Sequence, residues 1–167
     1  MALIKARSRG INLADTFAFT GTVSGAGGKI LQVKQGTTST QVEASFASET
    51  SLGLAVSITP SSSSNKVFIM VQIMGSTSGT TEFIQLVRDS TNILIPSGGS
   101  FPATIANDGG NTYPGTINFL DTPNTTSATT YKIKIGAQSG TAHVNARQDD
   151  TTNHRFTSTI TAMEISA

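Results

Sequence analysis

The sequence predicts an all-β protein built as an antiparallel sandwich, and three features of the chain support this. Serine and threonine make up roughly a quarter of the 167 residues, while charged residues make up only 13%. Threonine favours strands and serine favours turns. Strand-like segments recur about every 8–14 residues from Lys29 onward, which is a spacing typical of a sandwich. Helical periodicity is not present over any comparable stretch.

The first three predicted strands are 29–35, 40–46 and 52–60. In the second and third of these, every other residue is apolar, so one face of each strand is expected to point into a core. The residues expected to face inward are Val42, Ala44, Phe46, Leu52, Leu54, Val56 and Ile58.

A run of four serines lies between two apolar segments in "ITPSSSSNKVFIMVQIMG" (58–75). We interpret it as a turn between two strands rather than a linker, because residues 1–60 alone are too few to bury a core. Pro60 has no N–H group to donate and therefore ends the preceding strand. The following segment, 65–75, is apolar on both faces, which predicts a central strand covered on each side.

The remaining predicted strands complete a single sandwich domain over 29–167. A turn rich in Asp, Ser and Asn (88–92) separates the first two of them. These strands are 81–90, 91–96, 116–123, 130–137, 141–146 and 156–165.

Residues 1–28 differ from the rest and predict an extended N-terminal arm. Three cations, Lys5, Arg7 and Arg9, fall at every second position, so an extended chain would present them on one side. Phe17 and Phe19 alternate in the same way. We expect the arm to dock on its own domain or on a neighbour; the alternative is a solvated tail, which two exposed phenylalanines disfavour.

The segment Ser97–Gly115 is the longest one without a clear strand pattern. It holds five of the 16 glycines and two of the five prolines. Such a loop in a compact β domain is usually functional surface or an oligomer contact. The contact candidates in it are Phe101, Asp108, Asn111 and Tyr113; alternatively, the two aromatic residues anchor the loop to its own core.

No catalytic or metal-binding pattern is found, so the sequence predicts a non-enzymatic protein without a cofactor. His143 and His154 lie eleven residues apart, which matches no zinc signature and indicates a polar loop tip. Asp108 and Asn111 lack the further ligands of a calcium loop. The glutamates are spread along the chain and give no obvious carboxylate pair, and no nucleophile elbow, phosphate loop or His-Glu-x-x-His occurs.

Composition excludes several classes of partner. The net charge is +1, and eleven dispersed Lys and Arg residues form no basic groove for nucleic acid. There are no cysteines for a disulfide or a thiolate metal site. No apolar run reaches the roughly 20 residues of a membrane helix, so no membrane contact is expected. The basic N-terminus is not followed by an apolar segment, which disfavours a signal peptide and predicts folding in a reducing cytosol.

Four stretches together resemble a family of tailed-phage virion proteins that carry a jelly-roll domain similar to the tumour-necrosis-factor fold. They are "LAVSITPSSSSNKVFIMVQI" (54–73), "LVRDSTNIL" (86–94), "FLDTPNTTSATTYKIKI" (119–135) and "STITAMEI" (158–165). Residues 8–28 also resemble leader segments of marine and cyanobacterial phage structural proteins. The resemblance implies a jelly roll, a homotrimer and a place on the virion after synthesis in the host cytoplasm. Its motifs are strand and turn patterns, not catalytic signatures.

Within that family, we expect a capsid decoration (cement) protein on the outer capsid surface. The arm residues named above would contact the major capsid protein, and Phe83, Leu86 and Ile93 would serve as residual surface for a trimer interface. The alternative is a tail- or head-fibre tip that binds host surface glycans through Ser97–Gly115. A glycan-active enzyme is disfavoured because the sequence has no carboxylate pair.

Overall fold

A computed structural model describes residues 30–45, 50–79, 81–94, 104–106 and 111–167 of the chain. All regular elements in this part are β-strands, and every strand pairing is antiparallel, which confirms the predicted fold class. The predicted arm, residues 1–28, lies outside the described residues.

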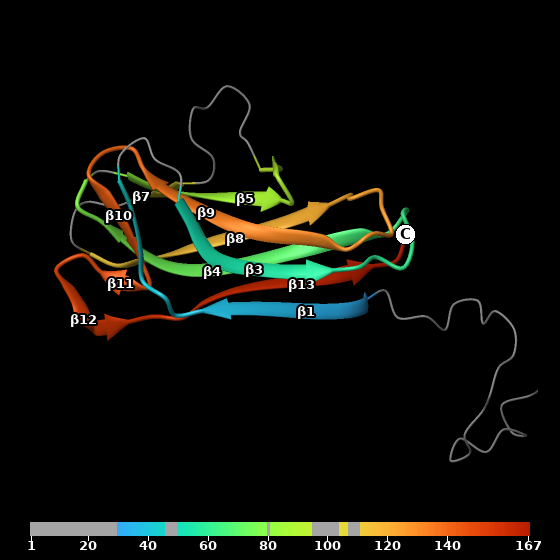
Figure 1. Cartoon of the computed structure of the whole chain (residues 1–167), viewed down its shortest axis with the longest axis horizontal. Helices are drawn as coiled ribbons and strands as arrows, with labels where there is room; N and C mark the ends of the chain where they lie inside the picture. The colour runs from blue at the N-terminus through green and yellow to red at the C-terminus, as the bar shows by residue number, and fades with distance from the viewer. Residues whose placement is uncertain (1–29, 46–49, 80, 95–103, 107–110) are drawn as a thin grey trace, which may run out of the picture.

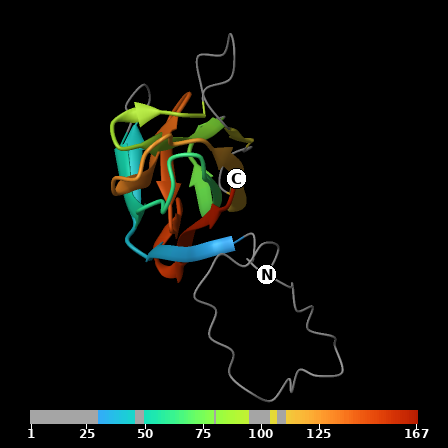
Figure 2. The same cartoon turned by 90° about the vertical axis from the view of Figure 1, so that its right-hand side faces the viewer.

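Two sheets pack face to face (Figures 1 and 2). The larger sheet contains β1 (Ile30–Thr38), β2 (Val42–Ser45), β4 (Lys66–Thr77), β8 (Tyr113–Asp121), β10 (Thr141–Val144) and β13 (Ser158–Ile165). The smaller sheet contains β3 (Thr50–Ile58), β5 (Thr81–Arg88), β6 (Thr91–Asn92), β7 (Thr104–Ala106) and β9 (Thr129–Ala137). A small hairpin of β11 (Ala146–Arg147) and β12 (Asp150–Arg155) projects from the end opposite the C-terminus (Figure 1).

The strand order is that of a jelly roll. The long strands of the larger sheet lie in the order β1-β13-β4-β8, and the smaller sheet has the order β3-β9-β5 with β6 and β7 along the far side of β5. The chain crosses between the sheets from β3 to β4, from β4 to β5 and from β8 to β9. With these crossings, the orders β1-β13-β4-β8 and β3-β9-β5 are those of two interlocked Greek keys.

The core lies between the layers and follows the predicted alternation. In β3 the inward side chains Leu52, Leu54, Val56 and Ile58 are all buried, and their neighbours along the strand are exposed. Ala44 of β2 is buried and Val42 is partly buried against the core, while Phe46 lies outside the described residues.

The prediction that 65–75 is a strand covered on both faces is wrong. Residues of β4 alternate between buried and exposed over most of its length, and Met70 is 41% exposed. The strand buried on both faces is β5, where every residue from Glu82 to Val87 is buried. A segment that is apolar on both faces can be a central strand covered on each side, or a strand whose outer face is an exposed apolar surface. The sequence is the same in both cases, and only the tertiary packing distinguishes them.

The serine-rich segment is a turn from β3 to β4, as predicted, and it is bonded to the last strand. Glu164 of β13 accepts hydrogen bonds from the backbone N–H of Ser61 at 2.6 Å and from Asn65 Nδ2 at 2.6 Å. Its second oxygen accepts from Gln32 Nε2 of β1 at 2.6 Å. Burial by itself would raise the pKa of Glu164, but the hydrogen bonds from Gln32, Asn65 and Ser61 outweigh it and lower the pKa to about 2.

Replacing Glu164 with glutamine is expected to destabilise the protein at pH 7 but not near pH 2. A carboxylate with a lowered pKa stabilises the fold above its unfolded value of 4.5, and that contribution is lost as the pH falls toward 2. Urea unfolding followed by circular dichroism from pH 7 to pH 3 measures the difference between wild type and Glu164→Gln. Glu43→Gln, at a mostly exposed carboxylate, is the control. A difference that stays constant across this range would contradict the prediction.

Candidate interaction surface

The exposed large apolar side chains found among the described residues are Ile30, Leu31, Val33, Met70 and Leu120. All of them except Leu31, which lies at a register shift in β1, stand at outward positions of the larger sheet. They come from β1, β4 and β8, which lie in one sheet together with β13. Single apolar residues scattered over a surface need no explanation, but a contiguous group marks an interaction site.

The strand register places four of the outward apolar side chains in one line across the sheet. Val33 of β1 pairs with Met163 of β13, Met163 pairs with Phe68 of β4, and Phe68 pairs with Leu120 of β8. Directly paired residues have Cβ atoms about 4.5–5.5 Å apart, so their side chains form a continuous row. Val33 is 54% exposed and Leu120 is 47% exposed, at the two edges of the sheet. We call Val33, Met163, Phe68 and Leu120 the apolar row.

The surface beside the apolar row is polar but almost free of charge. A shallow hollow of about 240 Å³ lies next to it, lined by Met70, Val71, Gln72, Thr116, Asn118, Thr159 and Thr161. Among the outward positions of β1, β13, β4 and β8, the single charged residue is Lys66 at the start of β4. Depletion of charge around an apolar centre is typical of protein–protein interfaces.

Two of the three predicted trimer contacts are not on the surface. Phe83 is 3% exposed and Leu86 is 0% exposed, because β5 is covered on both faces. The expectation that they provide residual surface is therefore corrected. Ile93 is partly buried and packs against the core.

The predicted contact residues of the arm and of the long loop are only partly within the described structure. The arm residues Lys5, Arg7, Arg9, Phe17 and Phe19 lie outside it, as do Phe101 and Asp108. Asn111 is exposed. Tyr113 begins β8 and packs against the core cluster, as an anchoring residue would.

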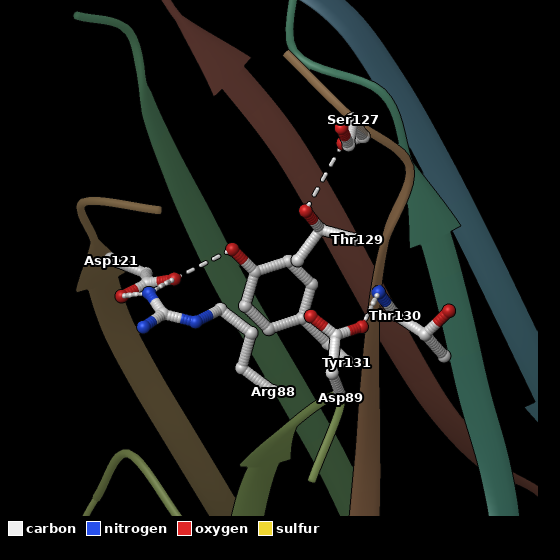
Figure 3. A network of polar contacts seen from close by, with 7 residues as sticks. All are labelled: Arg88, Asp89, Asp121, Ser127, Thr129, Thr130 and Tyr131. Atoms are coloured by element: carbon white, nitrogen blue, oxygen red, sulfur yellow. Dashed lines mark hydrogen bonds and ion pairs between the residues drawn. The ribbon is translucent and has the colours of Figure 1, made fainter. Parts of the chain in front are cut away.

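A second group of polar residues closes the end of the sandwich where β5 and β8 finish (Figure 3). Arg88 Nη1 donates to both carboxylate oxygens of Asp121 at 2.8 Å, and the Tyr131 hydroxyl donates to Oδ2 of the same residue at 2.7 Å. Burial and the bond to Asp121 both raise the pKa of Tyr131. Because both oxygens of Asp121 are occupied, this cluster fastens three strands and offers no free acid or base.

The histidines do not form a site. His143 lies on strand β10 and is mostly buried, 3.3 Å from Glu43, so the prediction that it sits at a loop tip is wrong. His154 is on β12, and its side chain is outside the described part of the structure. No group of three or more metal-type ligands occurs among the residues that the structure describes. In the same residues, no helix is long and apolar enough to cross a membrane.

Comparison with known proteins finds only distant structural likeness. No protein-family model matches the chain, and no curated protein is similar in sequence. A chain from the crystal structure of the infectious bursal disease virus particle is 15% identical with a TM-score of 0.44, over 93% of this chain and 41% of that one. A chain from the Gx strain of the same virus is 14% identical with a TM-score of 0.40, over 92% and 43%.

The protein thus spans less than half the length of either viral chain. Likeness at this level establishes neither a shared family nor a shared function, and the jelly-roll assignment rests on the strand order itself.

The apolar row could not be recognised from the sequence. Its members come from four strands that are distant along the chain, and only the register brings them together. The one available signal was the apolar character of both faces of 65–75, which also fits a covered strand.

Proposed function

We propose that the protein is a phage virion structural protein that forms a trimer and decorates the capsid, where it binds and stabilises the major capsid shell. The observation that carries the proposal is the apolar row on a nearly uncharged sheet face, because such a surface suits permanent contact with protein. The resemblance of residues 54–73, 86–94, 119–135 and 158–165 to tailed-phage virion proteins supports the place on the particle.

In this proposal the apolar row joins copies of the chain. A closed rotational arrangement would bury the row of every copy and cover β1 and β8, which are edge strands among those that the structure describes. An uncharged face suits this role, because identical faces that carried like charges would repel each other.

In the same proposal, the N-terminal residues bind the shell. Lys5, Arg7 and Arg9 would pair with acidic groups on the major capsid protein, and Phe17 and Phe19 would fill apolar grooves. A trimer carries three such segments, and their simultaneous binding strengthens attachment without any new contact.

Deletion of residues 2–24 is expected to weaken binding to capsid particles by more than about tenfold, because three linked contacts are lost together. The deletion leaves residues 30–167 intact, so it should not change the oligomeric state. Co-sedimentation with particles that lack the protein measures binding, and size-exclusion chromatography with light scattering is the control. Undiminished binding would contradict the role of these residues.

Copy number separates decoration from a fibre. Gel densitometry of purified virions should find the protein in hundreds of copies, spread over the shell. A few dozen copies or fewer, at one site, would instead support a fibre tip that binds host glycans.

Particles without the protein should also melt at a lower temperature than complete particles, because the protein is proposed to stabilise the shell. Equal melting temperatures would leave display or adhesion as its role.

A further inference from the structure

One acidic residue, Glu82, lies between the two sheets without a hydrogen-bond partner in the part of the chain that the structure describes. Its exposed fraction is 0%, and both of its carboxylate oxygens lack a hydrogen bond among the described residues. The carboxyl group rests directly on Gly75 of β4 in the opposite sheet, in the space that a side chain at that position would occupy. A buried polar group without a partner is uncommon in folded proteins and calls for an explanation.

Among the residues that the structure describes, no charged group balances this carboxyl. On β9, which pairs with β5, Lys132 and Lys134 point away from the core. His143 faces away on β10, while Lys66 and Arg88 lie at the far ends of β4 and β5. The neighbouring β7 (Thr104–Ala106) and the short β2 add one further charge, Glu43, which is mostly exposed and lies beside His143.

Below about pH 8, Glu82 is therefore a neutral acid while this end of the sandwich is closed. Burial raises its pKa from 4.5 to about 8. An acid with a raised pKa contributes its full stability below the unfolded value of 4.5, and this contribution is lost as the pH rises to about 8. Above about pH 8, Glu82 is ionised in the closed state as well as in the unfolded chain, so the stability falls no further.

At the other end of the sandwich, the buried carboxylates that the structure describes have hydrogen-bond partners. There the Arg88–Asp121–Tyr131 cluster satisfies both oxygens of Asp121, and the turn at Ser61 and Asn65 satisfies Glu164. The two ends are also separated along β5, because Glu82 is near its first residue and Arg88 is its last.

We propose that Glu82 makes the end of the sandwich around the β4–β5 turn a pH-sensitive element, which opens locally when water must reach the ionised carboxyl. The opening separates the start of β5 from Gly75 and the end of β4, while the far end stays closed. This pH-dependent opening is independent of the proposed role on the virion, because it takes place within a single chain.

Hydrogen exchange measured by mass spectrometry from pH 5 to pH 9 tests this proposal. After correction for intrinsic exchange, protection in peptides covering 74–84 is expected to fall about tenfold per pH unit up to about pH 8 and then level off. Peptides covering 119–123 and 158–165 should keep their protection. In Glu82→Gln, which cannot ionise, protection over 74–84 should not fall in this way as the pH rises.

Equal pH dependence in wild type and Glu82→Gln would overturn the proposal, and so would simultaneous loss of protection along the whole chain. If Glu82→Gln does not fold, Glu82→Met serves as the non-ionising variant. A titration of the wild-type Glu82 carboxyl carbon by NMR provides an independent measurement. A midpoint near the ordinary glutamate value of 4.5 would also overturn the proposal.

Discussion

The double substitution Val33→Lys and Leu120→Lys is expected to make the protein monomeric at concentrations where the wild type forms the proposed trimer. Both side chains are about half exposed in the single chain, so the fold should tolerate lysine at either position. At the edges of the apolar row, each lysine would place a charge in the proposed subunit contact. Loss of about 2 kcal/mol per apolar contact residue corresponds to about a thousandfold weaker association for each subunit contact.

Analytical ultracentrifugation over a range of concentrations measures this effect. The matched control is Ser57→Lys, which adds the same charge on the exposed outer face of the smaller sheet and should leave assembly unchanged. Circular dichroism confirms that both proteins are folded. The proposed contact fails if the double variant assembles like the wild type, or if the wild type itself is monomeric at tens of micromolar.

Replacing Asp121 with alanine is expected to lower the free energy of unfolding by about 3 kcal/mol. The change leaves the guanidinium of Arg88 without its partner and removes the acceptor of the buried Tyr131 hydroxyl. The loss is at the low end for a buried ion pair, because the Arg88 side chain is 27% exposed and can regain contact with water.

Two further variants separate the parts of this cluster. Tyr131→Phe removes only the hydroxyl and its bond to Asp121, so about 1 kcal/mol is expected. Asp89→Ala changes a neighbouring exposed carboxylate that accepts from the Thr130 backbone N–H, and a similar small loss is expected. Urea unfolding at pH 7 measures all three. A loss for Asp121→Ala no larger than that for Tyr131→Phe would show that the ion pair adds nothing to stability.

The local features of the fold could be predicted from the sequence, because they depend on neighbours along the chain. Alternating apolar residues in 52–58 determine which face of β3 is buried. Pro60 and the serines that follow determine that the chain turns there, since proline cannot continue a ladder and serine favours turns. The absence of helical periodicity was sufficient to exclude helices from the predicted domain.

Only the tertiary structure decided which of the apolar surfaces are covered. The apolar outer side chains of β4 are partly exposed, while the mixed strand β5 is buried on both sides, the reverse of what their compositions suggest. Burial of a second face depends on what packs against it from elsewhere in the chain, and strand patterns contain no information about that. Three features depend on contacts between residues far apart in sequence. They are the apolar row, the hydrogen bonds to Glu164 and the burial of Glu82 against Gly75. The strands and turns could thus be read from neighbouring residues, whereas the surface proposed for binding and the end proposed to open depend on sheet register and packing.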